Sequence, residues 1–373
     1  MANDPKGEVR SINKALRIAM IAPPYVAVPP VGYGGIEQVV SVLTEGLIAA
    51  GHEVTLFAAP GSVTSARLVR PLTAPITLGD PTGISEEIYF TAAAYHEVRS
   101  FDIIHDHTGL GPVLGSMLSR PPVVNTLHGP WTPQSRRMAR LLDTRINFVA
   151  ISNAQLNDNH QIRYAGMVYN GINLASHPFR EVKEDFLVFV GRINREKRPE
   201  VAIEIARKAG LPLVMIIKCS EPFERHYFEN AVAPLLGADI TVLEEPAQEV
   251  KVDIVGRARA LLFPIDWPEP FGLVMTEAMA CGTPVIARAL GSVPEVVRHG
   301  ITGFCCHSIA EMVEAVEEAT SLDPQTCRED MQRRFSAPVL VANYERVYRS
   351  VLARSLRQDD ARSNEQLLLS GTS

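Results

Sequence analysis

Short apolar runs alternate with longer amphipathic stretches along most of this chain, and they do so in two separate series. The first series has apolar runs at 17–22, 53–59, 101–107, 122–128, 147–152 and 166–170, with a helical pattern over 36–50. The second has runs at 186–191, 212–217, 239–243, 260–264 and 283–287, with helical patterns over 197–209 and 222–236. Because parallel strands need long connections, usually helices, each series predicts an α/β domain built on a parallel sheet.

The boundary between the two series is visible in the sequence. Apolar periodicity lapses and charged residues become frequent over 173–185, which places a linker there. A chain of 373 residues also favours two domains, at roughly 150 residues per domain. We therefore expect Rossmann-like domains at 16–175 and 182–336.

The two ends of the chain differ from these domains. Residues 1–15 are mixed in charge and are expected to form a flexible extension, and the polar residues 357–373 a disordered tail. Residues 337–356 predict a helix that packs back on the N-terminal domain. Its apolar face consists of Tyr344, Val347, Tyr348 and Val351.

Charge and cysteine content exclude several classes of protein. The net charge of -6 gives no basic field for nucleic-acid binding, so no nucleic-acid partner is expected. Five cysteines without a CxxC pair argue against a disulfide framework or a structural zinc site, and they suit a reducing cytosol. No secretory h-region follows the N-terminus, and four prolines interrupt the uncharged run 18–36. We expect a cytoplasmic protein without a membrane span.

The segment GRINREK carries the first candidate site. Gly191 closes a predicted strand, and Arg192 and Lys197 follow it. Ligands of parallel sheets bind at strand ends, where two cations suit a diphosphate. The alternative is a solvated basic turn at the start of a helix.

The segment PEPFGLVMTEAMACGTPVIA carries the second. Phe271, Gly272 and Leu273 open a predicted helix, whose free N–H groups favour a phosphate. Glu269 precedes this turn, and Glu277 lies about two turns further on. From there its carboxylate can accept hydrogen bonds from two hydroxyl groups of a ribose. Taken alone, Glu277 could be an exposed helix residue, but its neighbours 278–280 predict burial.

With GSVPEVVRHGITGF, these motifs resemble the retaining GT-B glycosyltransferases (glycosyltransferase family 4, glycosyl transferases group 1), which include bacterial mannosyltransferases and sucrose synthases. In the first half, GYGGIEQVV, GHEVTLFA, HDHTG, TLHG and NGIN stand where that family has them. The resemblance covers most of the chain and implies the GT-B fold, with two Rossmann-like domains facing across a cleft.

The resemblance also implies a role for each site residue. Arg192 and Lys197 would hold the donor diphosphate, and the backbone of Phe271, Gly272, Leu273 and Val274 would contact phosphates and sugar. Glu277 would bind the ribose, Glu269 the transferred hexose, and His128 would point at the sugar. This chain departs from the family at Arg198, where glycine is usual, and the extra charge is expected to affect the nucleotide end of the donor.

The GYGG segment at 32–35 follows the first predicted strand. Its spacing is not GxGxxG, so it is not a dinucleotide fingerprint. Gly34 and Gly35 are expected to let the backbone approach a ligand in a loop that closes over donor and acceptor. The alternative is a simple mobile loop.

Three histidines lie at predicted strand ends. His105 and His107 would share one face of their strand, with Asp106 on the other, so HDH does not form a metal site. We expect a structural role for His105 and His107. No DxD motif follows a strand, and Arg192 and Lys197 can supply the positive charge, so transfer without a metal or other cofactor is expected.

The predicted activity is transfer of a hexosyl unit from a nucleoside diphosphate sugar, UDP-glucose or GDP-mannose, to an acceptor hydroxyl with retention. The alternatives are a GT-B epimerase or phosphorylase and a non-catalytic nucleotide-sugar binding module; an NAD-dependent dehydrogenase is disfavoured by the missing fingerprint. The sequence does not reveal the acceptor or the oligomeric state.

One basic helix is a further candidate surface. Arg136, Arg137 and Arg140 lie in the predicted helix 133–145 with apolar residues nearby. This face would meet an anionic acceptor or a membrane surface. The alternative, which general experience favours, is a solvated helix face over the core.

Overall fold

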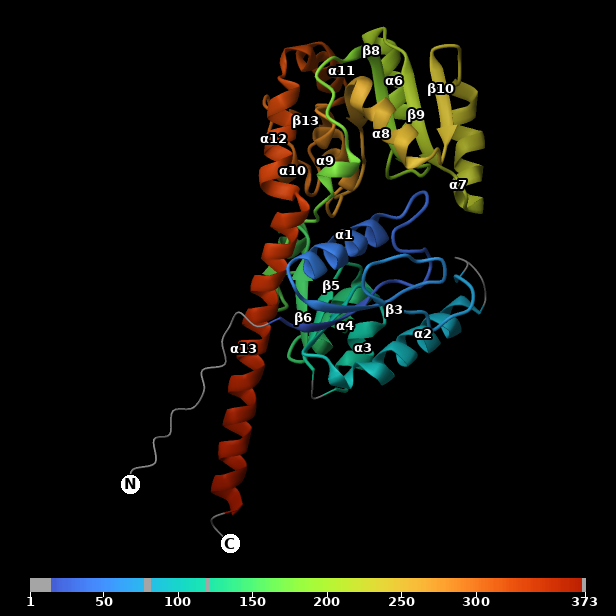
Figure 1. The fold of residues 1–373 in the computed structure, drawn as a ribbon. Coiled ribbons are helices and arrows are strands. Elements are labelled where there is room, and N and C mark those ends of the chain that lie inside the picture. Colours follow the sequence, from blue (N-terminus) through green and yellow to red (C-terminus); the bar gives the residue numbers. More distant parts are fainter. Residues whose placement is uncertain (1–14, 77–81, 119–120, 371–373) are drawn as a thin grey trace.

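A computed structural model describes residues 15–76, 82–118 and 121–370, and of 358–370 the backbone alone. The chain forms two α/β domains stacked on each other, joined along one side by a long C-terminal helix (Figure 1). Each domain holds one entirely parallel sheet, as the two series of apolar runs predict. None of the described helices is long and apolar enough to cross a membrane.

The N-terminal domain has a seven-stranded sheet in the order β3-β2-β1-β4-β5-β6-β7. Its strands are β1 (Arg17–Ile21), β2 (Glu53–Phe57), β3 (Arg67–Val69), β4 (Ile103–Asp106), β5 (Val123–Thr126), β6 (Ile146–Ala150) and β7 (Tyr164–Met167). Its helices are α1 (Gly35–Ala49), α2 (Gly83–Glu97), α3 (Gly111–Gly115), α4 (Pro133–Leu142) and α5 (Asn153–Asp158).

The C-terminal domain has a six-stranded sheet in the order β10-β9-β8-β11-β12-β13. Its strands are β8 (Glu184–Arg192), β9 (Leu213–Lys218), β10 (Ile240–Glu244), β11 (Ala258–Phe263), β12 (Val285–Arg288) and β13 (Gly303–Cys306). Its helices are α6 (Pro199–Ala209), α7 (Pro222–Tyr227), α8 (Gln248–Arg257), α9 (Leu273–Ala280), α10 (Val293–Val296), α11 (Ile309–Glu318) and α12 (Pro324–Phe335).

Both sheets are buried on two faces, which explains their continuous apolar strands. In β1, Ile18 and Met20 pack into one cluster with α1, and Ala19 and Ile21 into another with α2. The sequence does not predict the short strands β3 and β13. The predicted helix over 222–236 is α7 followed by a π turn at Phe228–Val232 and a 3₁₀ turn at Ala233–Leu235.

The strand order reverses direction between β1 and β4 in the first sheet and between β8 and β11 in the second. In open α/β sheets, ligands bind outside the carboxyl ends of the strands at this switch point. Residues that follow these strand ends in both domains line one shared cleft.

The last helix, α13 (Ala337–Ser370), leaves the C-terminal domain and runs along the N-terminal one (Figure 1). Its four predicted apolar residues join the core beside α1 and β1. The prediction of a disordered tail at 357–373 is wrong for 357–370, which continue the helix; this stretch contains no Gly or Pro and many good helix formers. Residues 371–373, like residues 1–14 of the expected extension, lie outside the described part.

The chain crosses between the domains twice, and the two crossings are bonded to each other. Ile172 N donates to Phe335 O at 2.9 Å, and Ala337 N donates to Ile172 O at 3.0 Å. A Cβ at Gly171 would lie 2.8 Å from Leu340 Cβ, so only glycine allows this close approach. The first crossing falls at the edge of the predicted linker.

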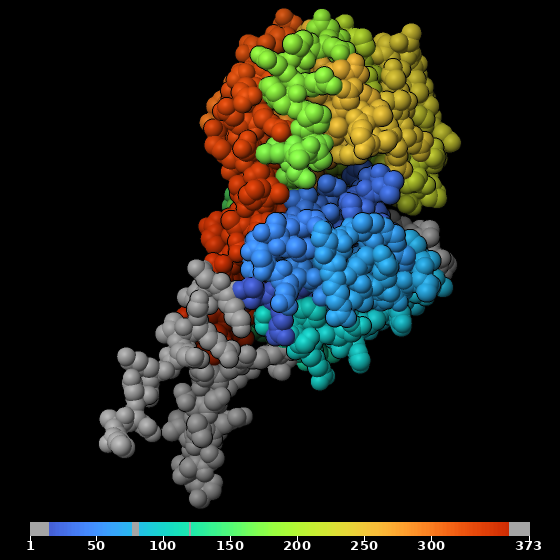
Figure 2. All heavy atoms as spheres, viewed as in Figure 1, coloured from blue at the N-terminus to red at the C-terminus, as the bar shows by residue number. Residues whose placement is uncertain are grey.

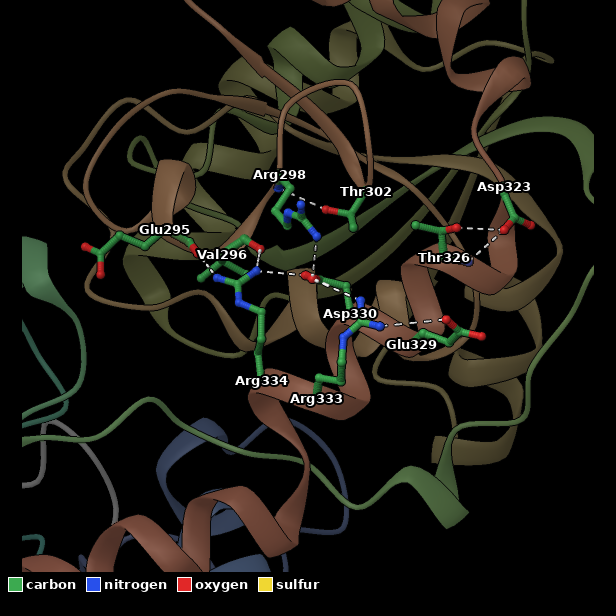
Figure 3. A network of polar contacts seen from close by, with 10 residues as sticks. All are labelled: Glu295, Val296, Arg298, Thr302, Asp323, Thr326, Glu329, Asp330, Arg333 and Arg334. Atoms are coloured by element: carbon green, nitrogen blue, oxygen red, sulfur yellow. Dashed lines mark hydrogen bonds and ion pairs between the residues drawn. The ribbon is translucent and has the colours of Figure 1, made fainter.

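A cluster of charges on α12 fixes the C-terminal domain beside these crossings (Figure 3). Asp330, 2% exposed, accepts hydrogen bonds from Arg298 at 3.1 Å and Arg334 at 2.8 Å. Arg334 also donates to the carbonyl oxygens of Glu295 and Val296 at the end of α10. The Glu295 carboxylate points away from this cluster (Figure 3) and accepts from the N–H groups at the start of α5, across the domain boundary.

Candidate active site

A cleft of about 650 Å³ separates the carboxyl ends of the two sheets. Loops after β1, β4 and β5 form its N-terminal wall, and loops after β8, β9, β10 and β11 form its C-terminal wall. In Figure 2 the segment around the start of α1 (blue) lies directly against the C-terminal domain. Here Tyr33 N donates to Glu245 Oε1 at 3.3 Å, across the cleft.

Arg192, the last residue of β8, lies on the C-terminal wall. Its Nε donates to Glu224 Oε1 at 2.7 Å, and Glu224 is fully buried. The other oxygen of Glu224 accepts from the N–H groups of Ser220 and Glu221, both at 3.0 Å. The start of α7 therefore fixes the carboxylate that orients the guanidinium.

Lys197 lies beside Glu269 in the same wall, and the two form an ion pair. Trp267 Nε1 donates to the same carboxylate oxygen at 2.9 Å. The ammonium also lies 5.0 Å from the ring centre of Phe263. Both side chains of the pair are only 11% exposed, so their charges are held in place and poorly screened.

The turn before α9 has the form that the sequence predicts. Gly272 has φ +77°, a left-handed backbone conformation that favours glycine. Phe271 is buried, and Ser292 Oγ donates to its carbonyl at 2.9 Å. Gly272, Leu273 and Val274 line the cleft at the positive end of the helix.

Glu277 faces the cleft from the second turn of α9 and is paired with Lys251 of α8 at 3.0 Å. Burial acts to raise the pKa of Glu277, but the Lys251 ammonium and His177 outweigh it, so that this pKa lies below its ordinary value. The carboxylate is therefore ionised at neutral pH. Ala278, Met279 and Ala280 beside it are buried, as predicted.

The two glycines on the N-terminal wall serve different purposes. A Cβ at Gly34 would lie 2.6 Å from Pro30 Cβ, so its space is taken by the loop itself. A Cβ at Gly35 would lie 3.5 Å from Leu273 Cδ1 in the other domain, an ordinary contact distance. Both line the cleft, and the atoms that approach them belong to the loop itself at Gly34 and to the facing domain at Gly35.

The three histidines form one stacked group. The rings of His105 and His107 lie 4.0 Å apart, and Asp106 points to the opposite side, where Tyr95 donates to it at 2.8 Å, as the strand periodicity predicts. His107 Nδ1 lies 2.8 Å from His128 Nε2, and His128 lines the cleft. Burial lowers the pKa of His128 to about 4 and those of His105 and His107 well below the ordinary value, so all three rings are neutral.

In the described part of the chain, no group of three or more His, Cys, Asp or Glu side chains could hold a metal ion.

Several cleft residues were not singled out from the sequence: Tyr25, Glu37, Glu87, Asn170, Lys218 and Lys251. Lys218 closes β9 as Arg192 closes β8, so the strand-end argument would have found it. Glu37 lies in the first turn of α1, directly after the GYGG segment. Lys251 lies in the first turn of α8, the helix that follows β10, so it also stands close to a strand end.

Arg198 does not lie where the sequence placed it. Its guanidinium bonds to Glu200 at 2.5 Å and Asp266 at 2.9 Å, and the residue does not line the cleft. The expected effect on the nucleotide end of a donor is therefore not supported. Its φ of +53° explains why glycine suits this position.

The arginines of α4 also lie away from the cleft. Arg136 is paired with Asp158 at 2.7 Å, and Arg140 donates to Gln161 at 2.5 Å. This helix therefore does not supply the wall that an acceptor would meet in the cleft. Membrane contact through the same face stays a prediction.

Two parallel-sheet domains with facing carboxyl ends and a cleft between them define a protein of the GT-B fold. Two family models match adjoining parts of the chain: Glycosyltransferase Family 4 at residues 33–176 and Glycosyl transferases group 1 at residues 175–336. The chain belongs to the GT-B glycosyltransferases, the family that its motifs resemble.

Curated relatives agree with this assignment. A D-inositol 3-phosphate glycosyltransferase from Thermobispora bispora is 26% identical over 317 residues, which cover 70% of this chain and 73% of that protein. One of the same name from Mycobacterium sp. (strain KMS) is 34% identical over 154 residues, which cover 39% of this chain and 34% of that protein. This chain thus matches only about a third of the length of the Mycobacterium relative.

Solved structures share the fold. Sucrose-phosphate synthase from Thermosynechococcus elongatus superposes with a TM-score of 0.75 at 22% identity, over 91% of this chain and 100% of that one. Anabaena Alr3699/HepE in complex with UDP-glucose superposes with a TM-score of 0.67 at 20% identity, over 92% of this chain and 100% of that one.

Proposed function

We propose that this protein transfers a hexosyl group from a nucleoside diphosphate sugar to an acceptor hydroxyl. The observation that carries the proposal is the C-terminal wall, where Arg192 and Lys197 flank the positive end of α9. Two fixed cations and a helix N-terminus suit the two phosphates of such a donor. Family membership points the same way.

The same wall offers one carboxylate to each sugar of the donor. Glu277, ionised and held by Lys251, accepts the ribose hydroxyls in this account. Glu269, held by Lys197 and Trp267, accepts hydroxyls of the transferred hexose. In this account Lys197, which is paired with Glu269, acts on the phosphate that leaves the hexose.

Retention of configuration is part of the proposal. The Glu269 carboxylate is engaged by two donors and does not serve as a nucleophile. We therefore favour front-face attack: the bond from the anomeric carbon to the phosphate oxygen breaks, the acceptor oxygen bonds to that carbon, and the acceptor proton passes to the leaving phosphate. Arg192 and Lys197 stabilise the developing charge without a divalent metal.

The donor is proposed to be of the UDP-glucose or GDP-mannose type. Anabaena Alr3699/HepE, which shares the fold, was solved with UDP-glucose. The relatives named D-inositol 3-phosphate glycosyltransferase place polyols, with or without a phosphate group, among the candidate acceptors.

The proposal is tested by incubating the purified protein with a panel of nucleotide sugars, with and without candidate acceptors, and measuring the release of nucleoside diphosphate. We expect one donor to support acceptor-dependent release, with EDTA leaving the rate unchanged. Release of free UDP with epimerisation, independent of acceptor, would indicate an epimerase, and phosphorolysis a phosphorylase. Tight binding without any turnover would indicate a binding module.

A further inference from the structure

The two walls of the cleft differ in the charged side chains that line them. The C-terminal wall carries carboxylates, those of Glu196, Glu245, Glu269 and Glu277, as well as cations. The described cations that line the cleft, Arg192, Lys197, Lys218 and Lys251, all belong to the C-terminal domain. Among the described residues of the N-terminal wall, the charged side chains are Glu37 and Glu87. Its histidines, His107 and His128, are neutral because burial lowers their pKa values.

Glu37 is the most unusual group on this wall. It is 6% exposed, and burial raises the pKa of its carboxyl group to about 7, although a hydrogen bond with its own backbone N–H opposes that rise. Its Oε2 lies 3.1 Å from the Cβ position at Gly34, beside the loop that meets the C-terminal domain. Burial makes the charged form of this carboxyl group costly, and a ligand that donates a hydrogen bond to it would offset part of that cost.

Two further side chains on the N-terminal wall, those of Asn170 and Glu87, have oxygen atoms that can accept hydrogen bonds from a ligand. Asn170, 4% exposed, lines the cleft, and its Oδ1 has no hydrogen-bond partner. Glu87 accepts a hydrogen bond from Tyr25 at 2.6 Å and keeps further lone pairs. This side of the cleft thus mainly offers acceptors, which hydroxyl groups satisfy and phosphate oxygens do not.

We infer that the acceptor is a hydroxyl-rich molecule without a phosphate group, a sugar or polyol whose hydroxyls donate to Glu37 and Asn170. The inference rests on the proposed function and specifies its acceptor class. A phosphate ester on this wall would lie beside the Glu37 and Glu87 side chains, while Lys197 and Lys251 on the opposite wall are already paired with Glu269 and Glu277. Like charges brought together in this way are strongly disfavoured.

Matched pairs of acceptors test the inference on the intact chain. Acceptor-stimulated release of nucleoside diphosphate is measured with myo-inositol and inositol 3-phosphate, with glucose and glucose 6-phosphate, and with neutral disaccharides. We expect stimulation by at least one unphosphorylated member, with kcat/KM about tenfold or more above that of its phosphate ester.

Two variants test whether Glu37 and Glu87 cause the preference for unphosphorylated acceptors. Glu37→Gln and Glu87→Gln keep the size of the side chain and remove its charge, so each should narrow the ratio between the neutral and phosphorylated members of a pair. Glu86→Gln removes the same charge from the exposed neighbour of Glu87 on α2 and should leave the ratio unchanged. Two different variants keep the test usable where one of them fails to fold.

Two results would overturn the inference. One is a phosphorylated acceptor used better than its neutral partner. The other is an enzyme that hydrolyses its donor but is stimulated by no neutral member of the panel. Failure of the proposed function itself looks different, because no donor would then be consumed under any condition.

Discussion

Arg198 shows how one residue can occupy a backbone conformation that favours glycine. Its left-handed conformation costs a residue with a Cβ about 1–2 kcal/mol. The ion pairs with Glu200 and Asp266 offset part of that cost. The charge is thus used to fix the start of α6.

Two substitutions at Arg198 separate the cost of the left-handed backbone from the contribution of the ion pairs. Arg198→Gly and Arg198→Ala both remove the guanidinium, but only alanine keeps the left-handed penalty. We expect the free energy of unfolding, measured by urea denaturation, to be about 1 kcal/mol higher for the glycine variant than for the alanine variant. Equal stability of the two would contradict the conformational explanation. Both variants should keep the donor KM of the wild type, because Arg198 does not line the cleft.

The lowered pKa of His128 predicts how the free energy of unfolding depends on pH. Its pKa of about 4 in the folded protein lies below the ordinary value near 6.5, so the unfolded chain binds the proton more readily. This contribution to stability is fully present above pH 6.5 and is lost as the pH falls toward 4. The sign is that of a neutral histidine buried by folding.

The size of the effect follows from the same linkage. Relative to His128→Gln, the wild type should lose about 1–2 kcal/mol of unfolding free energy between pH 7.5 and pH 5. Denaturation curves of both proteins at the two pH values measure the difference. His96→Gln, at an exposed position on α2, controls for the loss of a histidine. A difference that does not change with pH would show that His128 titrates as freely as in the unfolded chain.

At the scale of elements, the charged cluster around Asp330 stabilises the C-terminal domain, because it joins α12 to the end of α10. Asp330→Asn would leave Arg298 and Arg334 without their shared carboxylate and loosen the carbonyl contacts at the end of α10. Because the arginines are partly exposed, we expect a loss of about 2 kcal/mol rather than the 3–5 kcal/mol of a fully buried pair. Glu329→Gln on the same helix removes an exposed charge and should cost at most about 0.5 kcal/mol. Equal losses in a thermal or chemical melt would contradict this account.

The elements that the sequence predicts well are those with long apolar runs, because strands buried on both faces have no other way to pack. Arg192, Lys197, Glu269 and Glu277 were placed in one wall for a related reason: each stands at a strand end or on the first turns of the helix after it. Lys251, in the first turn of α8, and Asn170, at the end of the predicted run 166–170, meet the same criterion, but only the packing of helices and domains shows that their side chains line the cleft. The length of α13 was missed because a polar stretch without an apolar face gives no periodic signal.

At the scale of the molecule, the paired crossings at Ile172 and Ser336 form the joint between two independently packed domains. The walls of the cleft also touch away from this joint, at Tyr33 and Glu245. Such an arrangement permits a hinge motion that closes the cleft on a donor.

Scattering in solution tests this closure. The radius of gyration should fall when the protein is saturated with the nucleoside diphosphate of its donor, because closure expels water from the cleft. Lys251→Ala, which removes a cleft cation, should require more nucleotide for the same change. A radius that stays constant at saturation would contradict a large closure.

The division of the donor between two glutamates is the central claim, and steady-state kinetics of Glu269→Gln and Glu277→Gln test it most directly. The ribose does not change during transfer, so Glu277→Gln should mainly raise the donor KM, as loss of uniform binding does. The hexose does change, so Glu269→Gln should lower kcat beyond any change in KM. Lys197→Ala, which acts on the leaving phosphate, should lower kcat about ten- to a hundredfold. The opposite pattern, with kcat lost in Glu277→Gln at intact donor affinity and affinity alone changed in Glu269→Gln, would contradict the account.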